Sequence, residues 1–220
     1  MKHSSIGAVI FDLDGTLADT IKDLAAAFNS VLAAHGHPGH SFGMYKKMVG
    51  NGFMALMERS LPPLAATDKE HVGILFSEAV TVYTSMALDT TKPFPGVQEL
   101  LSTLQERSII LAVLSNKPDE MTRQMVSALF PGTSFIAVFG DKASRPRKPD
   151  PSAALSIAAL SDLPASRWAF VGDSGVDMAT GLASGMLPLG ASWGYRSREE
   201  LRTHGAAAIL EKPSDLLLHL

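Results

Sequence analysis

The sequence is organised around Ala8-Val9-Ile10-Phe11-Asp12-Leu13-Asp14-Gly15-Thr16-Leu17. The apolar run from Ile6 to Phe11 is typical of a strand that is covered on both faces of a parallel sheet. Asp12 and Asp14 then stand at the carboxyl end of this strand, where two neighbouring negative charges are costly unless a cation or a shared proton compensates them. The pair is therefore either a solvated turn or a metal-binding pair that does chemistry.

The composition narrows the class of protein. A chain of 220 residues, 46% of them hydrophobic, is large enough for one α/β domain or for a core that carries a smaller insert. Because 19 basic and 22 acidic residues give a net charge of -3, we expect neither a nucleic-acid nor a membrane partner. The lack of cysteine excludes disulfides, thiolate zinc sites and cysteine nucleophiles. The N-terminal apolar run is too short to span a membrane and has no cleavage-site pattern behind it, so we expect a cytoplasmic protein.

A long helical region follows the first strand. Between Ala18 and Thr90 the sequence has no strand-like run, and apolar residues recur at helical spacing. The helices expected here cover residues 21–35, 42–49, 51–61 and 67–88. Because an α/β alternation resumes after this region, we interpret residues 18–90 as an inserted helical cap. Residues 1–17 and 91–220 would then form the α/β catalytic core.

The core itself alternates between strands and helices. Apolar, strand-like runs are separated by helical segments and occur at residues 109–114, 135–139, 168–171 and 187–191. This order predicts an α/β fold with a doubly wound, mostly parallel sheet and right-handed crossovers. Such sheets bind ligands beyond the carboxyl ends of their strands, at the point where the strand order reverses.

Polar residues follow several of these strands at that edge. They are Asp12 and Asp14 after the first strand, Ser115 and Asn116 after the second, Lys148 after the third, and Asp173 with Asp177 after the fourth. Carboxylates with a few neutral oxygens suit a hard cation such as Mg²⁺, and Mg²⁺ beside a lysine and a hydroxyl suits a phosphoryl group. Residues Leu13 to Thr16, which include Gly15, form a loop whose backbone N–H groups could point at phosphate oxygens. The chain has no G-x-x-x-x-G-K-[ST] run, which disfavours nucleotide hydrolysis of the P-loop kind.

These strand-end groups resemble the four signatures of the haloacid dehalogenase superfamily, and their order and spacing agree over nearly the whole chain. The matching residues are Asp12-Leu13-Asp14-Gly15-Thr16-Leu17, Ser115-Asn116-Lys117, Lys148-Pro149, and Gly172-Asp173-Ser174 with Asp177. Three stretches are similar to the phosphoglycolate phosphatase branch of that superfamily, namely Gly50-Asn51-Gly52, Pro95-Gly96-Val97 and Ser115-Asn116-Lys117-Pro118.

The resemblance implies hydrolysis of a phosphoester through an aspartyl-phosphate. It implies that Asp12 attacks phosphorus, and that Asp14 protonates the leaving group and then takes a proton from water. It also implies a Mg²⁺ ion held by the Asp12 carboxylate, the Asp14 backbone carbonyl and Asp173. Metal-binding and catalytic roles thus fall on the same two strand ends.

The remaining strand-end residues receive supporting roles from the same resemblance. Ser115 and Lys148 would bind the phosphoryl oxygens, and Asn116 would contribute to substrate binding. Lys148 is preferred over neighbouring basic residues because the resemblance puts a lysine before Pro149. Asp177 would orient Lys148 or metal-bound water rather than bind the metal directly.

The insert suits a lid that opens for substrate and closes to exclude water, because it leaves the core beside the first strand and returns near residues 90–95. Asn51 lies between Gly50 and Gly52 at an expected helix start. It either presents N–H groups to a substrate carboxylate or hydroxyl, or is an ordinary helix cap.

The leading hypothesis is therefore a Mg²⁺-dependent phosphatase for a small phosphorylated metabolite, with 2-phosphoglycolate as the first candidate, acting as a monomer or a homodimer. A pyrophosphatase or a sugar-phosphate mutase on the same scaffold is an alternative, because Asp14 would serve either reaction. A signalling receiver that is phosphorylated on aspartate is a further alternative from a different class. The receiver is disfavoured because the nucleophile here ends the first strand and the large insert would have no role.

Overall fold

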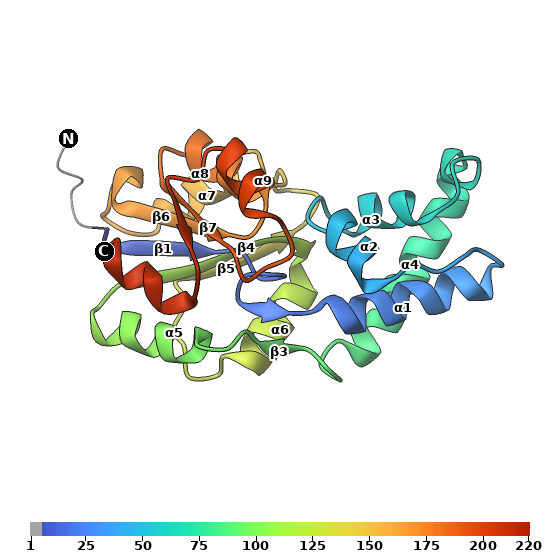
Figure 1. The fold of residues 1–220 in the computed structure, drawn as a ribbon, viewed down its shortest axis with the longest axis horizontal. Helices are drawn as coiled ribbons and strands as arrows, with labels where there is room; N and C mark the ends of the chain where they lie inside the picture. Colours follow the sequence, from blue (N-terminus) through green and yellow to red (C-terminus); the bar gives the residue numbers. More distant parts are fainter. Residues whose placement is uncertain (1–5) are drawn as a thin grey trace.

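A six-stranded sheet with strand order β5-β4-β1-β6-β7-β8 forms the centre of the computed structural model, which describes residues 6–220 (Figure 1). Every neighbouring pair in this sheet is parallel. The strands are β1 (Ala8–Phe11), β4 (Ile110–Pro118), β5 (Ala137–Asp141), β6 (Trp168–Gly172), β7 (Leu187–Ala191) and β8 (Ala208–Leu210). The predicted α/β fold with a parallel, doubly wound sheet is confirmed.

The strand order reverses at β1. The chain runs from β1 outward to β4 and β5 on one side, and then crosses to β6, β7 and β8 on the other. Phe11, the last residue of β1, is in register with Val113 of β4 and Val171 of β6. The chain that follows these three strands therefore emerges at one edge of the sheet, which is where a doubly wound fold binds its ligand.

Successive residues of β1 pack into different hydrophobic clusters on the two faces of the sheet. Val9 and Phe11 belong to one cluster, whereas Ala8 and Ile10 belong to the other, and all four are at most 1% exposed. This follows from the period of two residues along a strand. The helices of the core are α5 (Val97–Glu106), α6 (Asp119–Leu129), α7 (Ser152–Ala158), α8 (Gly175–Ala183) and α9 (Arg198–Thr203). Helices α5 and α6 pack in the first cluster and α7 in the second, so β1 is covered on both sides.

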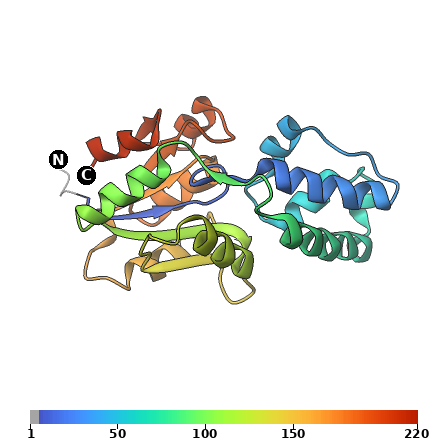
Figure 2. The same ribbon diagram turned by 90° about the horizontal axis from the view of Figure 1, so that it is seen from below.

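Four helices form the insert and lie together beside the sheet (Figure 2). They are α1 (Ile21–Ala34), α2 (Phe42–Met48), α3 (Phe53–Ser60) and α4 (Lys69–Met86), each within the range predicted for it. The side chains of Ser41 and Asp68 accept hydrogen bonds from N–H groups in the first turns of α2 and α4, which fixes where those helices begin. None of the helices in residues 6–220 is both long and apolar enough to cross a membrane.

The prediction of no strand between Ala18 and Thr90 is wrong at its margin. The chain crosses between the core and the insert twice, and the two crossing segments pair as an antiparallel ribbon of β2 (Ala18–Asp19) and β3 (Lys92–Pro93). Strands of two residues are too short to leave a periodic pattern in the sequence. The ribbon joins the insert to the core beside the end of β1.

Asp23, in the first turn of α1, connects the two segments that cross between the core and the insert. Its buried carboxylate accepts hydrogen bonds from the backbone N–H and the hydroxyl of both Thr90 and Thr91. Burial by itself raises the pKa of Asp23, but these hydrogen bonds outweigh it and hold the pKa below its ordinary value of 3.8. The start of α1 and the segment returning from α4 are thereby held together.

Candidate active site

The strand ends of the core enclose one cavity together with the insert. It is a small, partly open cavity. The predicted residues that line it are Asp12, Asp14, Ser115, Asn116, Lys148 and Asp173. Val49, Gly50, Gly52 and Phe53 of the insert lie across from them. The structure thus brings six of the predicted residues to one place from four separate strand ends.

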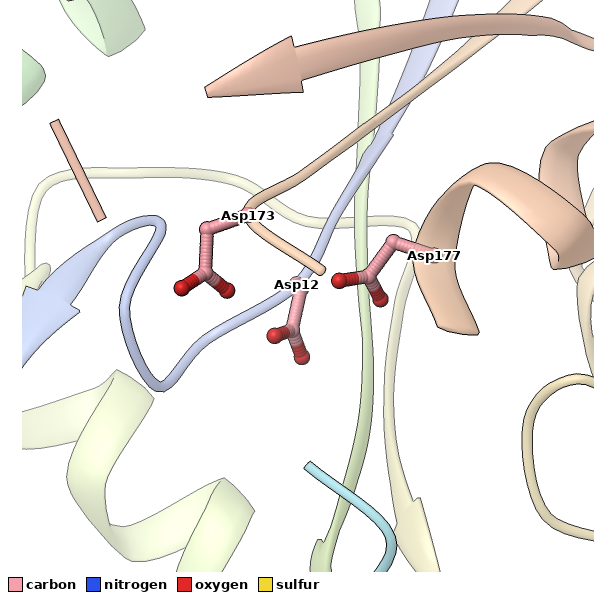
Figure 3. Close-up of side chains that lie close together, drawn as sticks. All are labelled: Asp12, Asp173 and Asp177. Atoms are coloured by element: carbon pink, nitrogen blue, oxygen red, sulfur yellow. The ribbon is translucent and has the colours of Figure 1, made fainter. Parts of the chain in front are cut away.

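Three carboxylates gather at the floor of this site (Figure 3). One oxygen each of Asp12, Asp173 and Asp177 can be chosen so that all three lie within 4.8 Å of one another, and the residues are buried. Burial, reinforced by the neighbouring Asp177, raises the pKa of Asp12 to about 7 against the lowering effect of Lys148, and raises the pKa of Asp173 well above its usual range. Buried oxygens that are costly to ionise fit a divalent cation, which would offset their charge.

The three carboxylates differ in how many of their oxygens are already engaged. Both oxygens of Asp177 accept hydrogen bonds, one from Lys148 Nζ at 2.7 Å and the other from Ser174 Oγ at 2.6 Å. Asp12 and Asp173 each have one engaged oxygen. That of Asp12 accepts from Lys148 Nζ at 2.7 Å, and that of Asp173 accepts from the Tyr195 N–H at 2.7 Å. Within residues 6–220, their second oxygens accept no hydrogen bond. Asp12 and Asp173 are therefore better placed than Asp177 to bind a metal ion directly.

Lys148 holds the positive charge of the site. Its Nζ lies 2.7 Å from an oxygen of Asp12 and 2.7 Å from an oxygen of Asp177, and its side chain is 2% exposed. Burial by itself lowers the pKa of Lys148, but the two carboxylates outweigh it and raise that pKa above its ordinary value. The ammonium therefore stays charged beside Asp12.

Asn116 positions Lys148 instead of pointing freely into the cavity. Its Oδ1 accepts from the Lys148 N–H at 2.9 Å, and its Nδ2 donates to the Lys148 carbonyl at 3.0 Å. The same Nδ2 lies 2.9 Å from the carbonyl of Gly50 in the insert. The amide is thus engaged with protein partners, which the predicted role in substrate binding did not anticipate.

Of the loop from Leu13 to Thr16, whose backbone N–H groups were predicted to face phosphate, Gly15 and Thr16 have their N–H groups engaged within the loop. The Gly15 N–H donates to the Ala18 carbonyl at 2.9 Å, and the Thr16 N–H donates to the Leu13 carbonyl at 3.3 Å. The N–H groups of Leu13 and Asp14, by contrast, meet no acceptor in the described part of the chain. Gly15 has a different importance, because its φ is +92° and a Cβ there would lie 2.4 Å from Asp173 Oδ2.

Asn51 does not cap α3, and it is not among the residues that line the cavity. With its side-chain amide turned so that the oxygen faces Arg59, that oxygen accepts from both terminal nitrogens of Arg59, at 2.8 and 2.9 Å. Gly52 is the residue that caps α3, and Gly50 and Gly52 line the cavity whereas Asn51 does not. The side chain of Asn51 faces Arg59 of the following helix, α3, which the sequence motif could not reveal.

Lys117 was quoted as part of a motif but received no role from the sequence. Its Nζ lies 2.8 Å from Asp14 Oδ1 and 2.8 Å from the hydroxyl of Tyr83 on α4, and its side chain is 0% exposed. Side chains two residues apart on a strand share a face. The position of Lys117 two residues after Ser115 could therefore have predicted that Lys117 lies on the side of the site.

The loop after β7 also contributes residues that were not predicted. Tyr195 and Arg196 line the cavity, and Arg196 donates to the Val49 carbonyl of the insert at 2.8 Å. This loop carries no periodic pattern, which is why its part in the cavity could not be predicted. The floor of the cavity thus carries a carboxylate paired with an ammonium, and Asp14 is a second carboxylate on its lining. Such a pair suits nucleophilic attack on an anionic group assisted by proton transfer.

Comparisons with known proteins show the family of this chain. The sequence profile of the haloacid dehalogenase-like hydrolases matches residues 9–191. A phosphoglycolate phosphatase of Caulobacter vibrioides is 34% identical over 216 residues, which is 97% of this chain and 91% of that protein. One from Pseudomonas savastanoi pv. phaseolicola is 30% identical over 209 residues, covering 92% and 75%. The crystal structure of a candidate phosphoglycolate phosphatase from Lactobacillus delbrueckii subsp. bulgaricus has a TM-score of 0.90, with 29% identity and 97% coverage of both chains.

The chain belongs to the haloacid dehalogenase-like hydrolase family. Within this family it is similar to the phosphoglycolate phosphatase branch, as its motifs predicted. The predicted enzyme class, a phosphoric monoester hydrolase, is confirmed.

Proposed function

We propose that this enzyme is a Mg²⁺-dependent phosphatase for small phosphomonoesters that works through an aspartyl-phosphate on Asp12, with 2-phosphoglycolate as the first candidate substrate. The observation that carries the proposal is the buried pair of Asp12 and Lys148 on the floor of a small cavity, next to Asp173. The substrate candidate rests on the relatives named phosphoglycolate phosphatase.

The donor set suits Mg²⁺, since the available ligands are carboxylate and carbonyl oxygens. In this proposal the ion would be held by the carboxylates of Asp12 and Asp173 and by the backbone carbonyl of Asp14. When bound, it would polarise the phosphoryl oxygens and offset negative charge in the site. Asp177, whose oxygens are both engaged, orients Lys148.

Charge repulsion is the main obstacle to attack by Asp12. Two unit negative charges 4 Å apart repel by about 4 kcal/mol at an effective dielectric constant of about 20. The ammonium of Lys148, 2.7 Å from Asp12, opposes this repulsion and can also bind a phosphoryl oxygen. The Ser115 hydroxyl accepts from the Lys117 N–H at 3.3 Å, so its own hydrogen remains available for a second phosphoryl oxygen.

Hydrolysis then proceeds in two displacements at phosphorus. In the first, a carboxylate oxygen of Asp12 bonds to phosphorus while the ester P–O bond breaks, and Asp14 gives its proton to the leaving alkoxide. In the second, Asp14 takes a proton from a water molecule whose oxygen attacks phosphorus, and the Asp12 carboxylate leaves. Asp14 regains its proton and inorganic phosphate is released, so atoms and charges balance over the cycle.

The insert, residues 18–90, would act as a cap over this chemistry. Val49, Gly50, Gly52 and Phe53 of the insert line the cavity. The loop that carries them is held by Asn116 and Arg196 through the carbonyls of Gly50 and Val49. Closing the site in this way excludes water and strengthens the electrostatic interactions inside it.

A phosphate-release screen tests the proposal. Purified protein is incubated with 2-phosphoglycolate, sugar phosphates, nucleotides, pyrophosphate and an aryl phosphate, each with Mg²⁺ and with EDTA. We expect Mg²⁺-dependent release from phosphomonoesters and none with EDTA. A preference for pyrophosphate, or isomerisation of a sugar phosphate without release, would favour the alternative enzymes on the same scaffold.

The nucleophile is tested in the same assay with Asp12→Asn, and Asp162→Asn, in an exposed loop, is the matched control. Asp12→Asn should abolish turnover, because an amide is not a competent nucleophile here. Wild-type turnover in Asp12→Asn would overturn the assignment.

A further inference from the structure

Lys117 is the only lysine besides Lys148 that is buried in the described part of the chain, and it lies between the core and the insert. Its Nζ contacts Asp14 from the end of β1 and Tyr83 from α4, at 2.8 Å in each case. Asp14 is 103 residues away in the sequence, and Tyr83 is itself 0% exposed. The ammonium therefore connects a predicted proton-transfer group to the insert.

The other polar contacts across this boundary end elsewhere. Asn116 and Arg196 reach backbone carbonyls of the loop after α2, and Tyr195 reaches Asp19 and Thr20 beside the ribbon. Within residues 6–220, only the contact through Lys117 joins a side chain of the four insert helices, that of Tyr83, to a predicted catalytic carboxylate, that of Asp14. It is thus the contact through which the position of the insert can act on Asp14.

Aromatic rings of the insert enclose this ammonium. The Lys117 Nζ lies 4.5 Å from the centre of the Tyr83 ring and 5.2 Å from that of Phe53. Rings at this distance stabilise a cation and keep water away from it. In such surroundings the bond to Asp14 is stronger than the same bond in water would be.

We propose that Tyr83 is a positioning residue, which holds Lys117 in place so that Lys117 fixes Asp14 for proton transfer while the insert lies on the core. With Oδ1 bound to Lys117, only Oδ2 of Asp14 remains to meet the leaving group or water. When the insert moves away, water replaces Tyr83 and Phe53 around the ammonium, and Asp14 loses its fixed orientation. The inference rests on the proposed function, because it concerns the proton-transfer role of Asp14.

Tyr83→Phe tests this, because it removes the hydroxyl and keeps the ring. The matched control is Tyr45→Phe, since Tyr45 is an equally buried tyrosine of the insert whose hydroxyl donates to Asn29 within the insert at 2.9 Å. Rates are measured with an alkyl phosphate, whose leaving group needs a proton, and with an aryl phosphate, whose leaving group does not. Tyr83→Phe should lower kcat about 10-fold on the alkyl phosphate and less than about 3-fold on the aryl phosphate, and Tyr45→Phe should alter neither. Equal losses on both substrates would overturn the proposal.

A double-mutant cycle then asks whether Tyr83 acts through Asp14. In an Asp14→Asn background, Tyr83→Phe should cause no further loss on the alkyl phosphate, since the group that it positions is gone. Multiplicative losses in the double variant would mean that Tyr83 affects turnover by another route, which would overturn the proposal.

A measurement without turnover separates this inference from the proposed function. Nitrogen-15 NMR of the lysine ammonium groups follows the hydrogen-exchange rate of Lys117, whose signal is assigned with Lys117→Arg. Exchange should be about 5-fold faster in Tyr83→Phe than in Tyr45→Phe, because one hydrogen bond to the ammonium is lost. Unchanged exchange in an active enzyme would overturn the inference alone, whereas an inactive wild type would overturn the function and the role of Asp14 with it.

Discussion

At the residue scale, the site depends on charges that are expensive to bury. Burial raises the pKa of both Asp12 and Asp173, while Lys148 remains charged between Asp12 and Asp177. Six strand-end residues that line the cavity could be predicted from the sequence, because their types and order are restrictive. The hydrogen-bond partners of Asn51 and Lys117 could not, since Arg59 and Tyr83 come from helices whose approach no local pattern encodes.

The close approach of Gly15 to Asp173 gives a prediction at this scale. Gly15→Ala should lower the affinity for Mg²⁺ about 10- to 100-fold, because its Cβ would lie 2.4 Å from Asp173 Oδ2 and displace a proposed metal ligand. The measurement is phosphate release as a function of Mg²⁺ concentration. Gly36→Ala is the control, since Gly36 also has a positive φ, +72°, but no atom lies within 4 Å of its Cβ position. Identical Mg²⁺ dependence in both variants would contradict this role of Gly15.

At the element scale, the ends of β1, β4 and β6 carry the proposed catalytic and metal-binding residues, and the ribbon of β2 and β3 joins the insert to the core. Parallel pairing brings the chain after these strands to one edge, so the sequence could predict the meeting of their polar residues. The ribbon was missed because its two-residue strands are specified by pairing across the insert and not by their own composition. The Asp23 carboxylate accepts four hydrogen bonds from Thr90 and Thr91, and these bonds hold the start of α1 against the segment that returns to the core.

Asp23→Asn is predicted to destabilise the folded protein by about 2 kcal/mol at pH 7, because an amide cannot accept all the hydrogen bonds that the carboxylate accepts. Urea unfolding of wild type and variant measures this difference. The exposed Asp89→Asn is the control and should unfold like the wild type.

The pH dependence of this difference has a definite sign. The folded-state pKa of Asp23 is lower than 3.8, so its contribution to stability is present above about pH 4 and is lost as the pH falls through the folded-state pKa. The gap between wild type and Asp23→Asn should therefore shrink below pH 4. A gap that stays constant down to pH 3 would show that the charge of Asp23 is not responsible.

At the scale of the whole molecule, the insert and the sheet complete the cavity together. The core supplies the carboxylates and Lys148, whereas the insert supplies the opposite wall and the partner of Lys117. Because the site contains buried carboxylates, a bound cation should stabilise the whole fold and not only the catalytic loops.

Removal of the metal is predicted to lower thermal stability. Saturating Mg²⁺ should raise Tm by roughly 5–10 °C over the value in EDTA, as expected for ligand at about 100 times Kd and a chain of this size. Asp173→Asn should abolish this shift without lowering the Tm measured in EDTA, because it removes a buried charge. Asp162→Asn should retain the shift. A full Mg²⁺ shift in Asp173→Asn would exclude Asp173 as a metal ligand.

The sequence by itself determined the alternating α/β order, the helical insert and which residue types stand at the strand ends, because short-range periodicity and strand-end motifs encode them directly. Only the tertiary structure decided which of those residues hold one another. It engaged the N–H groups of Gly15 and Thr16 within their own loop, joined Asn116 to Lys148, and placed Lys117 between Asp14 and Tyr83. The physical reason is that a buried polar group must find a partner from whichever element folds against it, and that element can lie anywhere in the chain.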